Sequence, residues 1–213
     1  MIRIVLLVIG YFVGTFETGY IYGKIANKDI RQAGSGNTGA TNALRVLGLK
    51  AGVIVFLGDG LKALIYCTII RLVFSASQPD YFMVYMLYGG LGVVIGHNYP
   101  FYLGFNGGKG IAATAGVIAS LDIRITLAVL IAFIAAVLIT RIVSIGSLLV
   151  VSIFLVMWIA FGQLGMLNIG SAALPESYVL VILFTGMAVW RHRGNIKRLL
   201  NGTENKFGSS KKQ

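Results

Sequence analysis

Residues 142–175, IVSIGSLLVVSIFLVMWIAFGQLGMLNIGSAALP, form the longest run of the chain without a charged residue. A helix that spans a membrane needs about 20 mostly apolar residues, and Ser144–Leu164 supplies them. The remainder, Gly165–Pro175, is rich in Gly, Asn and Ser and indicates a loop. This stretch therefore predicts a membrane-spanning helix followed by a turn.

The composition of the whole chain extends this prediction. Of the 213 residues, 57% are hydrophobic and only 12% are charged, whereas a soluble domain is about 25% charged. That excess of apolar surface excludes a soluble globule, and it also excludes disorder. Cys67 is the single cysteine, so a disulfide framework and a cysteine metal cluster are excluded, and its apolar surroundings indicate packing. We expect no metal and no cofactor.

The other apolar stretches give the remaining spans. One further segment, Ile111–Leu121, is apolar but too short for a hydrocarbon core of about 30 Å. Because irregular backbone at that depth must be covered, we expect it to be a half-helix that rests on protein. The longer candidates are Ile4–Tyr22, Ala51–Phe74, Tyr81–Phe105, Ile125–Thr140 and Ser177–Trp190.

The basic residues set the predicted orientation. Lys and Arg number 18 against 7 Asp and Glu, giving a net charge of +11, and they cluster in 24–50 and in 191–212. The positive-inside rule places both clusters in the cytoplasm. Both lie on one side only if the short segment counts as a crossing. The prediction is an all-α protein of about seven transmembrane helices, one of them short, with the N-terminus outside. Residues 1–200 form one transmembrane domain, and 201–213 form a polar cytoplasmic tail.

Three polar segments fall on the predicted inner side. The first, GSGNTGATN at 34–42, is followed by Arg45 and is named here the polar loop. Small residues let a ligand approach backbone N–H groups, which can form an anion-binding nest. An arginine can add a forked contact to phosphate oxygens. The alternative is a flexible polar connection between spans.

The second segment contains GHNYP at 96–100 and GFNGGKG at 104–110, the glycine-rich loop. The glycines precede a predicted helix start at Ile111, and a helix N-terminus suits phosphate. The loop is not a Walker A motif, because Gly110 rather than Ser or Thr follows Lys109. The alternative is a hinge. His97 taken alone is better interpreted as a membrane-interface residue than as a catalyst.

The third segment is RHRGNIKRLL at 191–200, followed by Glu204. On a helix continuing from the last span, His192 and Asn195 lie at i and i+3 on one face. That face could close over an anion, and the alternative is an ordinary basic anchor after a last span.

Glu17, Asp59 and Lys62 lie inside predicted spans, where ionisable groups usually face the protein interior. Asp59 and Lys62 are at i and i+3, so one helix face can pair them. A structural pair is at least as well supported as a catalytic one. Glu17 interrupts the first span and is a candidate partner for an arginine of the following loop.

Together the three segments resemble the bacterial acyl-phosphate:glycerol-3-phosphate acyltransferases, the PlsY family of membrane enzymes. The resemblance runs from the first span to Glu204. It implies seven spans with the N-terminus outside, in the bacterial cytoplasmic membrane, and an active site on the cytoplasmic face. It implies transfer of a fatty acyl group from acyl phosphate to the 1-hydroxyl of sn-glycerol 3-phosphate. The products are 1-acylglycerol 3-phosphate and phosphate.

The resemblance also implies roles for residues. The implied catalytic residues are Ser35, Arg45, His192 and Asn195. Glu204 is implied as structural, which is also the role given above to Asp59 and Lys62. Asn106 stands where the family more often has Lys, which removes one cation from the glycine-rich loop. The implied phosphate-binding residues are Ser35, Asn37, Thr41, Asn42, Arg45, Gly107, Gly108, Lys109, Gly110 and Ser144.

Two alternatives of different class remain at this point. A transporter for phosphate or an organic phosphate would also use glycines and cations, although no inverted repeat is visible. A scaffold for acidic lipid head groups explains only the tail.

The general base is open between His192 and a phosphate oxygen of the substrates. The expected partners are the two substrates and the bilayer, without nucleic acid. The sequence does not fix the oligomeric state, and a monomer is the simplest expectation.

Overall fold

The structure, a computed structural model, describes residues 1–206, and all regular elements within them are helical. This confirms the predicted all-α class. Three single 3-10 turns, Ile30–Gln32, Phe101–Leu103 and Ser171–Ala173, lie in the connections. The α-helices of the described residues are α1 (Ile2–Gly14), α2 (Thr18–Ile25), α3 (Ala40–Leu47), α4 (Leu49–Phe74), α5 (Phe82–Asn98), α6 (Ile111–Leu121), α7 (Ile123–Thr140), α8 (Val143–Gln163), α9 (Leu174–Arg191) and α10 (Arg193–Leu200).

Five segments of the described chain are long and apolar enough to cross a membrane. Two further helices are shorter than any of these five segments: α5 has 17 residues and α6 has 11. The predicted third span reached Phe105, but α5 ends at Asn98, because Pro100 cannot continue a helix and glycines follow. The five segments are Ile2–Ile25, Leu49–Phe74, Ile123–Thr140, Val143–Gln163 and Ser171–Arg191.

The first predicted span is two helices rather than one. α1 ends at Gly14 and α2 begins at Thr18, with Glu17 in the break between them. Glu17 is completely buried. Its carboxylate accepts a hydrogen bond from Thr38 and lies 2.9 Å from Nδ1 of His97. The expectation that Glu17 pairs with a loop arginine is therefore wrong, because its carboxylate lies against Thr38, His97 and Lys62 instead.

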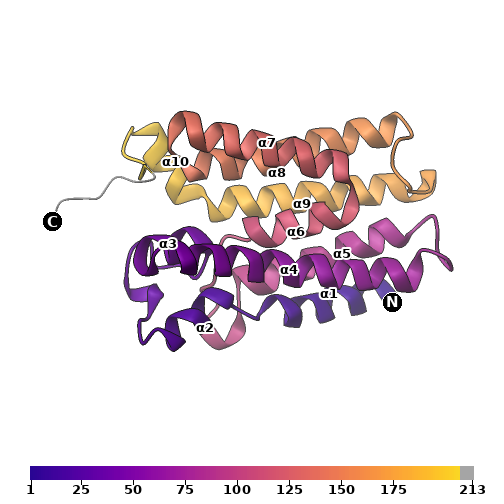
Figure 1. The fold of residues 1–213 in the computed structure, drawn as a ribbon. Helices are drawn as coiled ribbons and strands as arrows, with labels where there is room; N and C mark the ends of the chain where they lie inside the picture. Colours follow the sequence, from indigo (N-terminus) through magenta and orange to yellow (C-terminus); the bar gives the residue numbers. More distant parts are fainter. Residues whose placement is uncertain (207–213) are drawn as a thin grey trace.

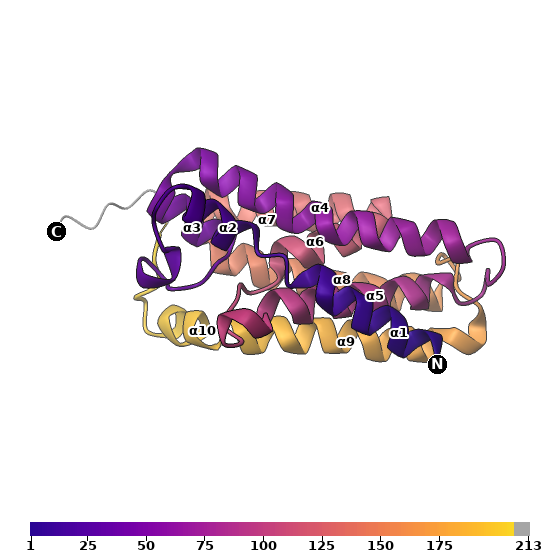
Figure 2. The ribbon, with the colours of Figure 1, turned by 90° about the horizontal axis from the view of Figure 1, so that it is seen from below.

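The short helix α6 lies in the middle of the bundle. Figure 1 shows α7, α8 and α9 on one side of it and α1, α4 and α5 on the other, and Figure 2 shows the same arrangement from below. Seven of its 11 residues are buried. At Gly116 it touches α4 so closely that a Cβ would lie 2.1 Å from the carbonyl oxygen of Gly60. The short segment thus rests on protein, as predicted.

An arginine of α4 covers the far end of α6. The Arg71 guanidinium donates hydrogen bonds to the carbonyl oxygens of Ser120 and Leu121, the latter at 3.1 Å. The last carbonyls of a helix have no partner within the helix, and they carry partial negative charge. Arg71 therefore satisfies both needs at a buried helix end.

Replacing Arg71 by methionine is expected to destabilise the protein. The substitution leaves two buried carbonyls without partners, which costs about 1–3 kcal/mol each. The measurement is thermal unfolding of purified protein in detergent, and a clear fall in Tm is expected. Arg71→Lys keeps a charged donor and should lose less. An unchanged Tm for Arg71→Met would contradict the capping role.

Glycines bring α1 and α5 into backbone contact. A Cβ added at Gly10, Gly14, Gly92 or Gly96 would lie within 2.2 Å of a backbone oxygen of the opposite helix. Any larger residue at these positions would push the two helices apart. This contact places the C-terminal end of α5, with His97, directly beside the break between α1 and α2.

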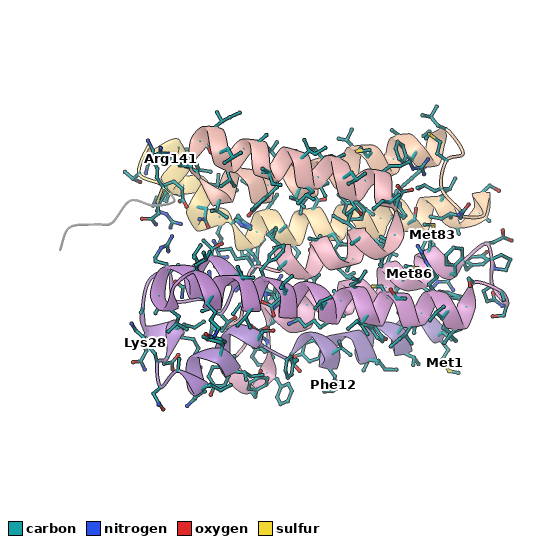
Figure 3. All side chains as sticks on the ribbon, viewed as in Figure 1. Met1, Phe12, Lys28, Met83, Met86 and Arg141 are labelled. Atoms are coloured by element: carbon teal, nitrogen blue, oxygen red, sulfur yellow. The ribbon has the colours of Figure 1, made fainter. Side chains whose placement is uncertain are left out.

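The basic segments gather at one end of the bundle. Figure 1 shows α3, α10 and the described end of the chain there, and the N-terminus at the other end. Lys28 and Arg141 lie at the same end as α3, opposite Met1 (Figure 3). The polar segments distant in sequence are therefore neighbours in the fold.

Candidate active site

A cavity of about 990 Å³ begins among α3, α10 and the two loops and continues between α4, α6, α7 and α8. Its lining divides by chemistry. Residues from the loops and helix ends are mostly polar and include several cations, whereas residues from the middle of the helices are mostly apolar, with Asp59 as a charged exception. The polar lining includes Ser35, Thr41, Arg45, Lys109, Ser144, His192 and Asn195, and the apolar lining includes Phe56, Leu61, Leu64, Val129, Phe133 and Val150.

The apolar part of the cavity reaches the outer surface of the bundle. Phe56, Leu57, Leu61 and Leu130 line it, and each of these side chains is about half exposed, at 46–50%. Such exposed apolar side chains belong in contact with lipid rather than water. A hydrocarbon chain could therefore lie in this part of the cavity and enter it sideways.

Three helix N-termini meet at the polar end. First-turn residues of α3 (Ala40, Thr41), of α6 (Ile111, Ala112) and of α8 (Val143, Ser144) all line the cavity. Each N-terminus presents unpaired N–H groups and partial positive charge, and so attracts anions. The sequence indicated this only for α6, because the approach of α3 and α8 depends on the tertiary fold.

The polar loop is held in place by Asn42. Its side-chain N–H₂ donates to the carbonyl oxygens of Ile30, Ala33 and Asn37, and its Oδ1 accepts from the Ser35 N–H at 2.8 Å. Asn42 is completely buried and does not line the cavity. The amide therefore shapes the loop that presents Ser35, rather than facing a ligand, which differs from its expected phosphate-binding role.

The glycine-rich loop is folded tightly against α5 and α9. The N–H groups of Gly107 and Gly108 donate to the carbonyl oxygens of Asn98 and His97. The Arg191 guanidinium donates to the carbonyl oxygens of the same two glycines. These two N–H groups are therefore engaged and do not face an anion, in contrast to expectation. Lys109 and Gly110, which follow, do line the cavity.

A chain of polar contacts links the glycine-rich loop to α10 and the tail. Lys109 donates to Oδ1 of Asn195, whose N–H₂ donates to Glu204 at 2.7 Å. Glu204 also accepts from Arg198 at 2.7 Å. Residues 205 and 206 line the cavity beside it. The start of the tail is therefore part of the site, and the predicted tail residues 207–213 lie outside the described residues.

His192 lies at the junction of α9 and α10, so the helix expected to continue through it is interrupted there. It is buried, and its Nδ1 lies 2.8 Å from the carbonyl oxygen of Ala188. Because a carbonyl can only accept, Nδ1 carries the hydrogen, and Nε2 keeps its lone pair. Burial, with Lys109 nearby, lowers the pKa of His192 to about 4, so the ring is neutral at ordinary pH.

Ser144 is buried in the first turn of α8, and its hydroxyl has no hydrogen-bond partner within the described residues. It also lines the cavity. Buried hydroxyls are normally hydrogen-bonded, so this one has unused capacity for a ligand.

The cavity brings most of the predicted site residues together. Asn42, Gly107, Gly108 and Lys62 do not line it. Those that do are Ser35, Asn37, Thr41, Arg45, Asp59, Lys109, Gly110, Ser144, His192, Asn195 and Glu204.

The charge on Lys109 predicts a pH dependence of anion binding. Burial lowers the pKa of Lys109 to about 8, while Glu204 raises it and the nearby arginines lower it. The ammonium is present below that pH and lost above it. The KM for an anionic substrate is therefore expected to rise above about pH 8. Removing the charge in Glu204→Gln should move this rise to lower pH. A flat KM between about pH 7 and 9.5 would contradict the assignment.

Fold and cavity together define a multi-span membrane protein whose site joins an anion-binding end to an apolar groove, as an enzyme that handles lipids requires. A family model described as glycerol-3-phosphate acyltransferase matches residues 4–202. The chain belongs to this family, and the family resemblance inferred from the motifs is confirmed. It is an acyltransferase and not the transporter considered above.

Relatives and solved structures agree with this assignment. The chain is 44% identical to the glycerol-3-phosphate acyltransferase of Halalkalibacterium halodurans, over 97% of this chain and 96% of the relative. It is 40% identical to that of Clostridioides difficile, over 98% and 97%. The crystal structure of PlsY (YgiH), an integral membrane glycerol 3-phosphate acyltransferase, in its glycerol 3-phosphate form superposes with a TM-score of 0.82 at 32% identity, covering 97% and 96%. The lysophosphatidic acid form of PlsY superposes with a TM-score of 0.79 at 33% identity, covering 97% of this chain and 95% of the PlsY chain.

Sequence reasoning missed two parts of the site. Asn205 and Lys206 line the cavity although the tail was assigned to a separate region, and His97 is a buried residue that also lines the cavity. Glu204 was the available signal for the tail. For His97 the signal was the glycine-rich segment that follows it, since Gly108 packs directly against the His97 ring.

Proposed function

We propose that this protein transfers a fatty acyl group from acyl phosphate to the 1-hydroxyl of sn-glycerol 3-phosphate, which forms 1-acylglycerol 3-phosphate and inorganic phosphate. The observation that carries the proposal is the division of one cavity into a cationic end and an apolar groove. Both substrates bear phosphate, and one also bears an acyl chain. The glycerol 3-phosphate and lysophosphatidic acid forms of the solved relative support this reading.

The polar end would hold the two phosphates. Arg45 and Lys109 supply charge, the N-termini of α3, α6 and α8 add partial charge, and Ser35 and Ser144 offer hydroxyls. Asn37, Thr41 and Gly110 complete this wall, and Asn42, Gly107 and Gly108 act by holding the two loops. Asn195 would orient Lys109, and Glu204 would brace Asn195.

The reaction needs no acyl-enzyme. Acyl phosphate is a mixed anhydride, so its carbonyl carbon is activated and phosphate leaves readily. The 1-hydroxyl oxygen attacks that carbon, the carbon–oxygen bond to phosphate breaks, and phosphate departs with the electron pair. His192 Nε2, with its lone pair, accepts the hydroxyl proton. Positioning of the two anions supplies most of the rate.

We also propose the placement of the chain. Seven crossings, counting α5 and the short α6, would leave the N-terminus outside and the C-terminus in the cytoplasm. The active site would then lie at the cytoplasmic face of the bacterial inner membrane, where the cations gather (Figure 3). We treat residues 1–206 as one domain, because Glu204 contacts α10. A monomer suffices, since the described chain supplies every residue of the cavity.

The test is direct esterification. Purified protein in detergent is given radiolabelled glycerol 3-phosphate and palmitoyl phosphate, and the label is extracted into organic solvent. Label in the lipid phase, dependent on the acyl phosphate and without any vesicle gradient, is the expected result. Uptake of label into proteoliposomes with no esterification would overturn the proposal.

A further inference from the structure

Asp59 of α4 lines the cavity, and the mechanism given above does not use it. The residue is only 1% exposed. Its ion-pair partner Lys62, which lies at i+3 on the same helix, does not line the cavity. Burial of a carboxylate is costly unless its oxygen atoms have partners, so we consider the two oxygens of Asp59 one at a time.

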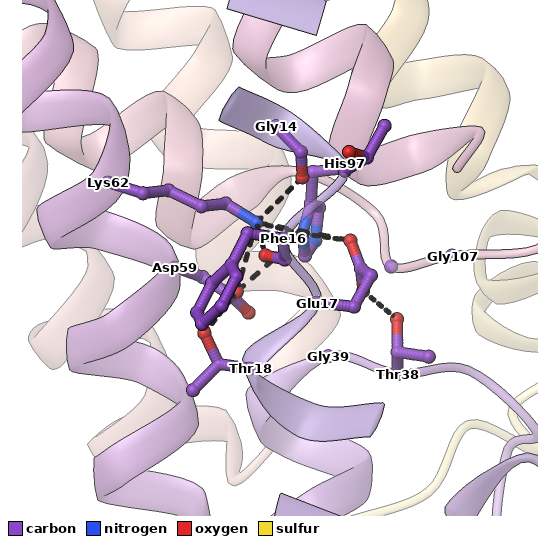
Figure 4. A network of polar contacts seen from close by, with 12 residues as sticks. Gly14, Phe16, Glu17, Thr18, Thr38, Gly39, Asp59, Lys62, His97 and Gly107 are labelled. Atoms are coloured by element: carbon purple, nitrogen blue, oxygen red, sulfur yellow. Dashed lines mark hydrogen bonds and ion pairs between the residues drawn. The ribbon is translucent and has the colours of Figure 1, made fainter. Parts of the chain in front are cut away.

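One carboxylate oxygen of Asp59 is engaged by the protein (Figure 4). Oδ1 accepts a hydrogen bond from the Thr18 hydroxyl at 3.0 Å and another from the Lys62 ammonium at 3.2 Å. Gly58 permits this close approach of α2 to α4, because a Cβ there would lie 2.6 Å from the Thr18 hydroxyl oxygen. The two contacts hold the carboxylate in one orientation, and the lysine pairs its charge.

The second carboxylate oxygen, Asp59 Oδ2, is buried and has no hydrogen-bond partner within residues 1–206. Buried polar atoms are normally hydrogen-bonded, so an unpaired one on a residue of the cavity wall is available to a ligand. An ionised carboxylate can only accept hydrogen bonds. The ligand group that it suits is therefore a donor, such as a hydroxyl, and not a phosphate oxygen.

Asp59 lies where the cationic end of the cavity meets the apolar groove. A Cβ at the next residue, Gly60, would lie 3.4 Å from the carbonyl oxygen of Ala112, which belongs to the first turn of α6. That turn follows the glycine-rich loop, which carries Lys109. Two residues further along α4, Leu61 belongs to the apolar lining. A substrate group at this place lies between a phosphate held by the cations and a hydrocarbon chain held in the groove.

The two substrates of the proposed reaction offer few hydrogen-bond donors. Ionised acyl phosphate has none, and glycerol 3-phosphate has its two hydroxyls. The 1-hydroxyl gives its hydrogen to His192 Nε2 in the mechanism given above, so the 2-hydroxyl remains. The charge of Asp59 is paired with Lys62, which reduces its repulsion of a nearby phosphate.

We infer that Asp59 determines the substrate specificity of this site, because its Oδ2 accepts a hydrogen bond from the 2-hydroxyl of glycerol 3-phosphate. Thr18 and Lys62 are positioning residues that hold the carboxylate for this contact. The inference rests on the proposed function, since it assigns the contact to a substrate of that reaction. It predicts that the enzyme prefers glycerol 3-phosphate to a phosphate ester with a single hydroxyl.

The first experiment compares two acyl acceptors in the parent protein. 3-Hydroxypropyl phosphate has the primary hydroxyl and the phosphate of glycerol 3-phosphate but lacks the 2-hydroxyl, so both acceptors present the same charge to the cations. With palmitoyl phosphate as donor, kcat/KM for glycerol 3-phosphate should exceed that for the analogue by about 10- to 100-fold, because the analogue leaves a buried carboxylate oxygen unpaired. A ratio near one would overturn the inference.

The second experiment measures the same ratio in Asp59→Asn and Asp59→Ala. In Asp59→Asn the amide oxygen can keep the contacts of Oδ1, whereas the N–H₂ group that replaces Oδ2 cannot accept. The ratio should fall by about fivefold or more in Asp59→Asn and approach one in Asp59→Ala. Both acceptors are measured on one preparation, so the ratio does not depend on the folded fraction. If Asp59→Ala yields no folded protein, Asp59→Asn decides the test.

A structural role for Asp59 predicts a different result. Damage to the fold, or loss of a group that acts on the 1-hydroxyl, lowers kcat/KM for both acceptors by the same factor. The ratio then stays as in the parent, and this outcome overturns the inference. Because the 2-hydroxyl does not react, the loss for glycerol 3-phosphate should appear mainly as a higher KM.

The matched control is Asp122→Asn. Asp122 caps the N-terminus of α7 and pairs with Arg124, and it does not line the cavity. Asparagine is also a good N-cap residue, so the variant should fold and keep the parent's ratio. A ratio that falls as far in Asp122→Asn as in Asp59→Asn would overturn the inference.

The proposed function and the inference fail in different ways. If the parent esterifies neither acceptor with palmitoyl phosphate, the proposed function fails and the inference fails with it. If the parent esterifies glycerol 3-phosphate but does not prefer it to the analogue, or if both Asp59 variants retain the preference, the inference alone fails.

Discussion

Lys109→Met should lower kcat/KM for glycerol 3-phosphate by roughly 100- to 1000-fold. The ammonium is the only full charge that the glycine-rich loop brings to the cavity, and the Gly107 and Gly108 N–H groups are engaged by α5. Methionine fills the same space without charge or donor. Steady-state kinetics with palmitoyl phosphate measure the loss.

The matched control is Lys197→Met. Lys197 is an exposed lysine of α10, at the same end of the bundle, and does not line the cavity. Its replacement should leave kcat/KM within about twofold of the parent, since an exposed charge away from a site contributes little. Equal losses in the two variants would show that overall positive charge, and not the position of Lys109, sets the rate.

His192→Ala should lower kcat by roughly 100- to 1000-fold with a smaller effect on KM. The Ala188 carbonyl fixes the hydrogen on Nδ1, so Nε2 is the lone pair that the cavity offers to the attacking hydroxyl. Burial, with Lys109 nearby, holds the pKa of His192 at about 4. Two bound phosphates would raise that pKa toward the working pH, because nearby negative charge favours the imidazolium.

Arg193→Ala serves as the control for the His192 variant. Arg193 is adjacent in sequence but exposed, and its guanidinium contacts Trp190. Its replacement should leave kcat unchanged. If His192→Ala lost less than about tenfold, a phosphate oxygen of the substrates would be the proton acceptor, and His192 would act only in binding.

The helices were predictable because hydrophobic length and charge placement are local properties of the chain. Ile111–Leu121 was recognised as short and covered because a helix of 11 residues is shorter than the thickness of a hydrocarbon core. The break at Glu17 was not, since it depends on Thr38 and His97, which lie far away in sequence. A single acidic residue in an apolar run looks the same whether its helix continues or ends.

The sequence predicted which residues belong to the candidate site better than it predicted what each of them contacts. Hydroxyls, amides and cations beside glycines indicated anion binding at Ser35, Arg45 and Lys109, and the cavity gathers them. The sequence could not distinguish residues that face the cavity from residues that build its walls. An asparagine side chain offers the same donors and acceptors whether it binds a ligand or holds a loop. Only the fold shows that Asn42 uses them on backbone groups.

The half-exposed side chains along the apolar groove affect how the enzyme meets its substrate. In the proposed reaction, an opening toward the hydrocarbon lets the acyl phosphate arrive by diffusion within one leaflet, and lets the lysophosphatidate leave by the same route. The quantity that sets the rate is then the mole fraction of acyl phosphate in the bilayer or micelle, not its bulk concentration. Adding inert detergent at constant total substrate should slow turnover by surface dilution, while glycerol 3-phosphate, arriving from water, keeps its ordinary dependence on volume.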